Sequence, residues 1–137
     1  MMLGAHTEML RNLVLVFAGG VVGTLLRAGL VPLIGEPADL PLGVLVVNLV
    51  GAFALGFLVG YLTRIGSGET DHGLRLLFGT GLLGGFTTYS MLATDVAVMI
   101  QDGRVLAGVA YGFGSVVLGI GASWLGLLAA QVSRRPA

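Results

Sequence analysis

Four long apolar segments constrain the fold of this chain more than any other feature of its sequence. They cover residues 10–33, 42–63, 74–100 and 105–132. Each is close to the roughly 20 residues that an α-helix needs to cross a bilayer. The whole chain is 55% hydrophobic and 10% charged, which is typical of membrane proteins. We therefore predict an all-α integral membrane protein, with residues 1–137 forming a single four-helix transmembrane domain.

The composition excludes several other classes of protein. There is no cysteine, so disulfides and thiolate chemistry are ruled out. The net charge is zero and no basic block occurs, so we expect no nucleic-acid partner. The first apolar run is longer than a signal-peptide core, which indicates a retained helix. The 24 glycines favour close helix packing. Glycines recur four residues apart, which predicts packing faces, at Gly19/Gly23, Gly56/Gly60, Gly81/Gly85 and Gly108/Gly112.

The arginines indicate how the chain is oriented in the membrane. With four spans, both termini and the middle loop lie on one side. That side holds five of the seven arginines, namely Arg11, Arg64, Arg75, Arg134 and Arg135. The other side holds Arg104, together with Arg27 if Arg27 lies at the end of the first helix. Because cytoplasmic loops are richer in Lys and Arg, we expect a multi-pass plasma-membrane protein with both termini in the cytoplasm.

The third apolar segment contains the run Gly84-Gly85-Phe86-Thr87-Thr88-Tyr89-Ser90. Neighbouring glycines weaken a helix. In lipid, a weakened helix releases backbone groups that need new partners. Membrane proteins tolerate this where the chain is buried in protein or lines a polar site. We therefore predict that the third helix is broken near Gly84–Thr88, close to a bound ion.

Asn48 and Arg27 are polar residues inside the spans, and each has two interpretations. Asn48 makes an interhelical hydrogen bond, or it offers its amide donor to an anion. Arg27 extends to the interface and fixes the topology, or it attracts anions at a pore mouth. Asp95 is either functional at depth or lies near the far interface. The residues alone leave these alternatives open.

The remaining polar groups at depth are mostly hydroxyls. These donors suit an anion, whereas carbonyls released at the break would suit a small cation. His6 and His72 fall outside the spans, and we find no metal-ligand set and no catalytic Ser-His-acid or paired-carboxylate arrangement. We therefore expect that the protein is not an enzyme. The hydroxyls in and after the third segment's break are those of Thr87, Thr88, Ser90 and Thr94, and the fourth segment adds Tyr111 and Ser115.

Together these residues resemble the CrcB/Fluc family of fluoride channels over nearly the whole chain. The resemblance is carried by Gly19-Gly20-x-x-Gly23-x-x-x-Arg27, Asn48-x-x-Gly51-x-Phe53, Gly84 to Ser90, and Tyr111-x-x-x-Ser115. Each motif alone is weak. Their occurrence in this order, on a chain of this length with four spans, is specific.

The resemblance implies an antiparallel dimer of four-helix subunits with two pores, each lined by both subunits. It implies passive, selective efflux of fluoride, which protects the cell against fluoride entering as HF. It also implies a structural sodium ion at the dimer centre, held by the backbone carbonyls of Gly84 and Thr87, and a vestibule position for Arg27. The residues assigned to the pore by the resemblance are Asn48, Phe86, Thr88, Tyr89, Ser90, Leu92, Tyr111 and Ser115.

The chain departs from the family pattern just after the threonine pair. The family commonly reads Thr-Thr-Phe-Ser-Thr-Phe, whereas this chain reads Thr87-Thr88-Tyr89-Ser90-Met91-Leu92. Tyr89 keeps an electropositive ring edge, but Leu92 has no ring and Met91 has no donor. The uneven arginine distribution adds to this departure. We therefore hypothesise that this subunit pairs with a related, oppositely inserted partner in a heterodimer, and the alternative is an antiparallel homodimer.

Two other functions are weighed against the channel. A small multidrug exporter needs a deep carboxylate in its first helix, and residues 10–33 contain no acid. A subunit with only a structural or assembly role, which does not conduct, is favoured to some extent by Met91 and Leu92. It predicts no fluoride flux with any partner.

Overall fold

The computed structural model describes residues 2–35, 37, 40–65 and 69–132. Most residues in these ranges are helical, and no strand occurs in them. The helices are α1 (Met2–Ile34), α2 (Leu42–Ile65), α3 (Glu69–Leu74), the π-helix η2 (Arg75–Leu83), α4 (Gly84–Phe86), α5 (Tyr89–Gln101) and α6 (Val105–Val132). Within the described residues, four helical stretches are long and apolar enough to cross a membrane: His6–Ile34, Leu42–Arg64, Asp71–Gln101 and Val105–Val132.

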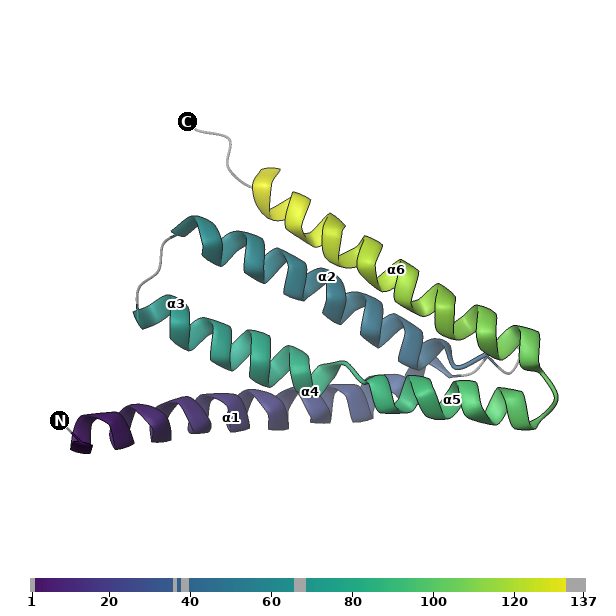
Figure 1. The fold of residues 1–137 in the computed structure, drawn as a ribbon, viewed down its shortest axis with the longest axis horizontal. Helices are drawn as coiled ribbons and strands as arrows, with labels where there is room; N and C mark the ends of the chain where they lie inside the picture. The colour runs from purple at the N-terminus through teal and green to yellow at the C-terminus, as the bar shows by residue number, and fades with distance from the viewer. Residues whose placement is uncertain (1, 36, 38–39, 66–68, 133–137) are drawn as a thin grey trace.

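The helices alternate in direction along the bundle. The start of α1, the end of α2, the start of α3 and the end of α6 lie at one end, and the end of α1, the start of α2 and the α5–α6 turn lie at the opposite end (Figure 1). Arg11 and Arg75 belong to the first end, and Arg104 belongs to the second. Arg134 and Arg135 lie outside the described residues. The predicted clustering of Arg11 and Arg75 at one end therefore holds, whereas the membrane side that this end faces stays a prediction.

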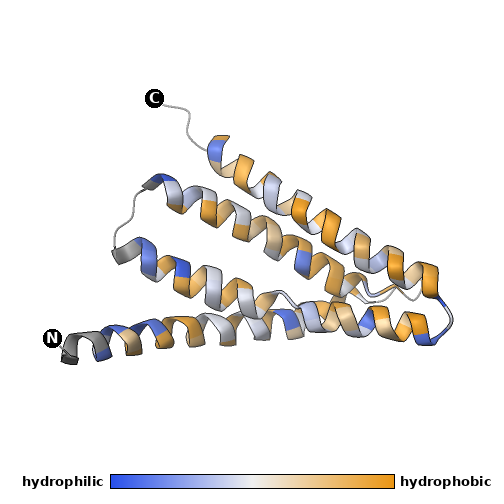
Figure 2. Ribbon diagram, viewed as in Figure 1, coloured by the Kyte–Doolittle hydropathy of each residue, from blue (hydrophilic) through white to orange (hydrophobic). Residues whose placement is uncertain are grey.

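Hydrophobic residues occur along most of the length of the four spans (Figure 2). Many large ones are exposed, among them Phe17, Leu33, Leu106 and Phe113. In water such a surface would be strongly unfavourable, whereas lipid tails solvate it. The four apolar helices and this surface make the chain a multi-pass membrane protein.

The glycine pairs lie at the helix contacts, as their spacing predicts. An added Cβ at Gly19 or Gly23 would collide with backbone atoms of η2 or α4, and one at Gly85 would collide with Gly20. Gly56 meets the Ser123 carbonyl in the same way on α6, and Gly108 lies against α5. Small residues therefore let neighbouring backbones touch, which is the usual way to gain packing energy in lipid.

The third span changes its neighbour part-way along. The stretch from η2 to α4 packs on α1, whereas α5 packs on α6. Between them Thr87 and Thr88 are extended, with φ/ψ of −82°/160° and −150°/120°. We call these two residues the extended segment. It lets one apolar stretch contact both sides of the bundle.

The C-terminal end of α6 is fixed by a side chain from α2. The Arg64 guanidinium donates through Nη1 to the carbonyls of Ala130 and Gln131. Carbonyls in the last turn of a helix have no partner within that helix. A cation at this position also interacts favourably with the negative end of the helix dipole. Arg64 thus holds α2 and α6 together at the end of the bundle where α1 begins and α6 ends.

Candidate functional site

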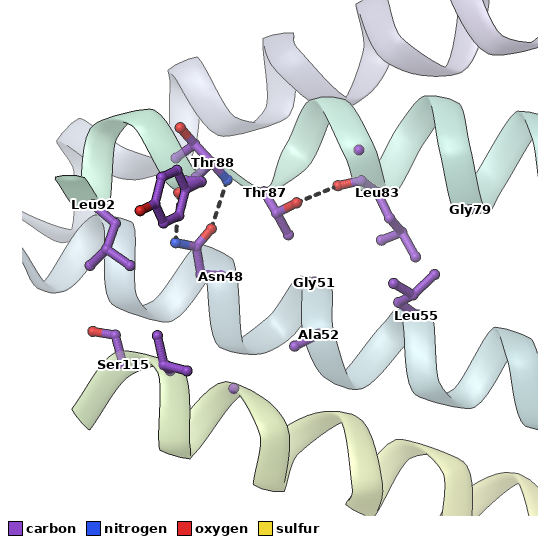
Figure 3. A pocket seen from close by; sticks show the side chains of 14 residues that line it. Asn48, Gly51, Ala52, Leu55, Gly79, Leu83, Thr87, Thr88, Leu92 and Ser115 are labelled. Carbon is purple, nitrogen blue, oxygen red and sulfur yellow. Dashed lines mark hydrogen bonds between the residues drawn. The ribbon is translucent and has the colours of Figure 1, made fainter. Parts of the chain in front are cut away.

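The extended segment borders a groove between α2, the third span and α6 (Figure 3). The groove has a volume of about 370 Å³. Most of its lining is apolar, which suits a site with few, well-placed polar groups. The residues that line it are Asn48, Gly51, Ala52, Leu55, Gly79, Leu83, Gly84, Thr87, Thr88, Tyr89, Leu92, Ser115, Val116 and Gly119.

Local sequence explains why the chain becomes extended at the threonines. Thr88 is the N-cap of α5, and its Oγ1 accepts a hydrogen bond from the Met91 N–H at 3.2 Å. Threonine is favoured at this position. Thr87 ends α4, and its hydroxyl donates to the Leu83 carbonyl at 2.9 Å. The glycines themselves stay helical, because Gly84 has φ/ψ of −64°/−37°.

Asn48 forms two hydrogen bonds with the backbone of Thr88. Its Nδ2 donates to the Thr88 carbonyl at 2.9 Å, and its Oδ1 accepts from the Thr88 N–H at 2.7 Å (Figure 3). The pairing fixes which way the amide points, since the reverse orientation would place donor against donor. One N–H of Nδ2 remains for another acceptor. Asn48 thus makes the interhelical bond and still lines the groove with a donor.

The Thr88 and Ser90 hydroxyls provide a further donor beside the groove. Their oxygen atoms are 3.2 Å apart, and either one can donate. Whichever donates, the hydrogen of the other hydroxyl stays available. Ser115 differs, because its Oγ donates to the Tyr111 carbonyl at 2.6 Å. In this rotamer Ser115 presents only lone pairs to a ligand.

The groove brings together five of the eight predicted pore residues. Asn48, Thr88, Tyr89, Leu92 and Ser115 line it. Tyr89 is 81% exposed, so much of its ring points away from the rest of this chain. Leu92 stands at the position where the family pattern has an aromatic ring, and its side chain is buried in the groove wall.

The other three predicted pore residues lie elsewhere. Phe86 is buried in α4, and Ser90 is exposed beside the groove without lining it. Tyr111 donates its hydroxyl to the Pro41 carbonyl at 3.0 Å, which ties α6 to the start of α2. For this single chain, Tyr111 therefore has a contact that sequence reasoning did not find.

Arg27 lies at the extended segment and not at an end of α1. Its Nη1 donates to the Thr87 carbonyl at 3.1 Å, and α1 continues to Ile34. Neither of the two interpretations from the sequence included this contact. The nearby Thr24 hydroxyl lies 3.5 Å from the Gly85 carbonyl. Side chains of α1 therefore meet the carbonyls on the side of the third span that faces α1.

Gly51 belongs to the Asn48-x-x-Gly51-x-Phe53 motif, and the structure gives it a packing role. A Cβ at Gly51 would collide with the Thr87 side-chain methyl. Gly51 follows Asn48 at i+3, so both lie on one helix face. The spacing was therefore the signal that both residues serve the same contact.

The carbonyls near the extended segment can be compared with the needs of a sodium ion. The described residues contain no group of three or more His, Cys, Asp or Glu that could hold a metal, so a cation there would depend on carbonyl oxygens. In a continuous helix the Thr88 N–H would donate to the Gly84 carbonyl, but it donates to Asn48. The Thr87 carbonyl accepts one bond from Arg27 and keeps one lone pair. The donor set fits a small monovalent cation.

The family is decided by a match over most of the chain. The model of the family "CrcB-like protein, Camphor Resistance (CrcB)" matches residues 14–127. The chain belongs to the CrcB family. This confirms the resemblance drawn from the four motifs.

Relatives of this CrcB-family chain carry a consistent description. It is 41% identical over 113 residues to the fluoride-specific ion channel FluC of Novosphingobium aromaticivorans, covering 80% of this chain and 87% of the relative. It is also 41% identical over 127 residues to FluC of Gloeobacter violaceus, covering 90% and 98%. With FluC of Oceanobacillus iheyensis it shares 36% identity over 120 residues, covering 86% and 90%. The family is thus one of ion channels and not of enzymes.

Proposed function

We propose that this protein is a subunit of a fluoride-selective channel that mediates passive fluoride efflux and fluoride resistance. The observation that carries the proposal is the groove beside Asn48. Its polar donors are few and lie among apolar walls, and none of the described residues that line it carries a carboxylate. An Asn48 N–H and a hydroxyl of the Thr88/Ser90 pair are available to an anion. The relatives are named fluoride-specific ion channels, which agrees with this chemistry.

The proposed assembly is an antiparallel dimer in the plasma membrane, with a structural sodium ion at its centre and both termini in the cytoplasm. Tyr89 and Gly84 are exposed on the single chain, although both line the groove. A second subunit across this face would complete the pore wall. The carbonyls of Gly84 and Thr87 are the proposed sodium ligands, and Arg27 is the proposed vestibule residue.

A partner-dependent subunit is the second candidate, and Leu92 is the observation that favours it. This aliphatic side chain occupies the groove wall where the family pattern has an aromatic ring, and Met91 adds no donor. A related subunit inserted in the opposite direction would then supply the conducting pore. A structural subunit that never conducts is the limiting case.

Fluoride efflux from liposomes tests the proposal. Purified protein is reconstituted alone and together with any co-encoded relative, and release is followed with a fluoride electrode and with chloride as the control ion. We expect rapid fluoride release and no chloride release. Release only from the mixed sample would select the partner-dependent subunit. No release from either sample would contradict the channel function.

A further inference from the structure

The Asn48 carboxamide matches both polar groups of one backbone position. It donates to the Thr88 carbonyl and accepts from the Thr88 N–H. A carboxamide presents a donor and an acceptor side by side. It can therefore bond to both the carbonyl and the N–H of one extended residue, as the opposite residue does in an antiparallel sheet. Thr88 is itself extended, with φ −150° and ψ 120°. Asn48 therefore replaces the partners that a helix would have given Thr88.

This pairing changes the hydrogen bonding of the preceding turn. In a continuous α-helix the Thr88 N–H would donate to the carbonyl of Gly84. The carbonyl of Leu83 keeps its donors, because it accepts from the Thr87 N–H at 3.0 Å and from the Thr87 hydroxyl at 2.9 Å. The carbonyl that loses its helical donor is therefore that of Gly84, the next residue along the chain.

The rigid helix α2 presents Asn48 at a fixed position. α2 runs without interruption from Leu42 to Ile65, and Gly51, one turn further, leaves the space that the Thr87 methyl fills. Backbone groups left unpaired in a bilayer are strongly unfavourable. Without Asn48, the helical bond to Gly84 would be the simplest way for the Thr88 N–H to regain a partner.

We propose that Asn48 is a positioning residue that keeps the third span open at Thr87–Thr88 and so leaves the Gly84 carbonyl oxygen available to a monovalent cation. The inference rests on the proposed channel function and deepens it. One amide then contributes to both ion sites. Its remaining N–H is a donor at the anion groove, and its oxygen binds the Thr88 N–H, which therefore does not donate to the Gly84 carbonyl. Loss of Asn48 removes the cation's ligand as well as the anion's donor.

The test compares three variants by their thermal unfolding in detergent, in sodium chloride and in potassium chloride of equal concentration. Asn48→Leu removes both polar groups, whereas Asn48→Asp keeps an acceptor for the Thr88 N–H. Thr63→Val is the control on the same helix, since its hydroxyl bonds only to the Val59 and Gly60 carbonyls of its own turn.

We expect sodium to raise the melting temperature of the wild type and of Thr63→Val. At about 100 times the dissociation constant, mass action predicts a rise of roughly 5–10 °C. Asn48→Asp retains this rise, and Asn48→Leu loses it. Persistence of the full rise in Asn48→Leu would overturn the proposal, as would its absence from the wild type.

Two further outcomes remain decisive. If Asn48→Leu gives no monodisperse protein, a folded Asn48→Asp that melts equally in both salts overturns the inference. Failure of the proposed channel function has a different signature. In that case the wild type would release no fluoride from liposomes. Sodium would still raise the melting temperature of the wild type, and Asn48→Leu would still lose this rise.

Discussion

The contact between α1 and the η2–α4 stretch differs sharply from the groove on the other side of the same span. At Gly19, Gly23 and Gly85 the backbones touch and leave no room for a Cβ. On the α2 side, Gly51 also lacks a Cβ, but its space admits the Thr87 methyl beside an open groove of about 370 Å³.

The difference shows that glycine has two uses in this protein. Against α1, it brings two helices together and supplies packing energy. Against α2, it makes room for a change of backbone conformation, and Asn48 then pairs with the released groups. A rigid contact on one side thus supports a polar opening on the other.

The largest effect is expected from a charge placed in the groove. Asn48→Asp puts a carboxylate beside any bound anion, and two unit charges about 4 Å apart repel by about 4 kcal/mol at an effective dielectric constant of 20. Fluoride flux should fall by roughly a thousandfold, measured as liposome efflux with Thr63→Val as control. Undiminished flux would reject Asn48 as an anion ligand.

The next effect concerns the closed contact. Gly23→Ala places a methyl group against the Leu82 carbonyl, and overpacking of this kind costs about 1–3 kcal/mol. Gly29→Ala on the same helix meets nothing within 4 Å and is the matched control. We expect a lower melting temperature for Gly23→Ala alone. Equal melting temperatures of the two variants would show that the helices move apart enough to admit the methyl group at little cost.

A smaller gain is expected from restoring the missing ring. Leu92→Phe extends into the groove that Leu92 lines and offers an electropositive ring edge to an anion. Fluoride efflux from the chain reconstituted alone should rise a few-fold. Leu118→Phe is the control, because Leu118 is an exposed residue on α6. If Leu92→Phe lowers efflux, the aliphatic residue belongs to a pore adapted to it.

The smallest effect is expected at Ser115. Its hydroxyl donates within its own helix, to the Tyr111 carbonyl, and therefore offers no hydrogen to the groove. Ser115→Ala should change fluoride efflux by less than about twofold, because the substitution removes no hydrogen that is offered to the groove. A tenfold loss would show that the hydroxyl rotates to bind the anion.

The sequence predicted four apolar spans, and the helices that contain them extend beyond the apolar residues. The first apolar run begins near Leu10, whereas α1 begins at Met2. Apolar residues mark only what lies in lipid, and a helix continues into polar residues as long as its hydrogen bonds persist. The helical stretch that contains the third span likewise begins before residue 74, because α3 begins at Glu69.

The glycine pair gives a second case in which local reasoning was incomplete. It indicated a weak point in the third span, yet Gly84 is helical and the extended residues are Thr87 and Thr88. Gly85 is held against the backbone of Gly20, so its flexibility is not used. Helix propensity describes how well a residue suits an isolated helix, and here the tertiary contacts override it.

The sequence by itself determined the membrane class, the four apolar helices, the glycine packing faces and the family. All of these depend on composition and on spacing along one helix, which are local properties. Only the tertiary structure decided that Asn48 meets Thr88, that Arg27 meets the Thr87 carbonyl, and that Tyr111 meets Pro41. These contacts join residues 40 to 70 positions apart, and their geometry exists only once the helices have packed.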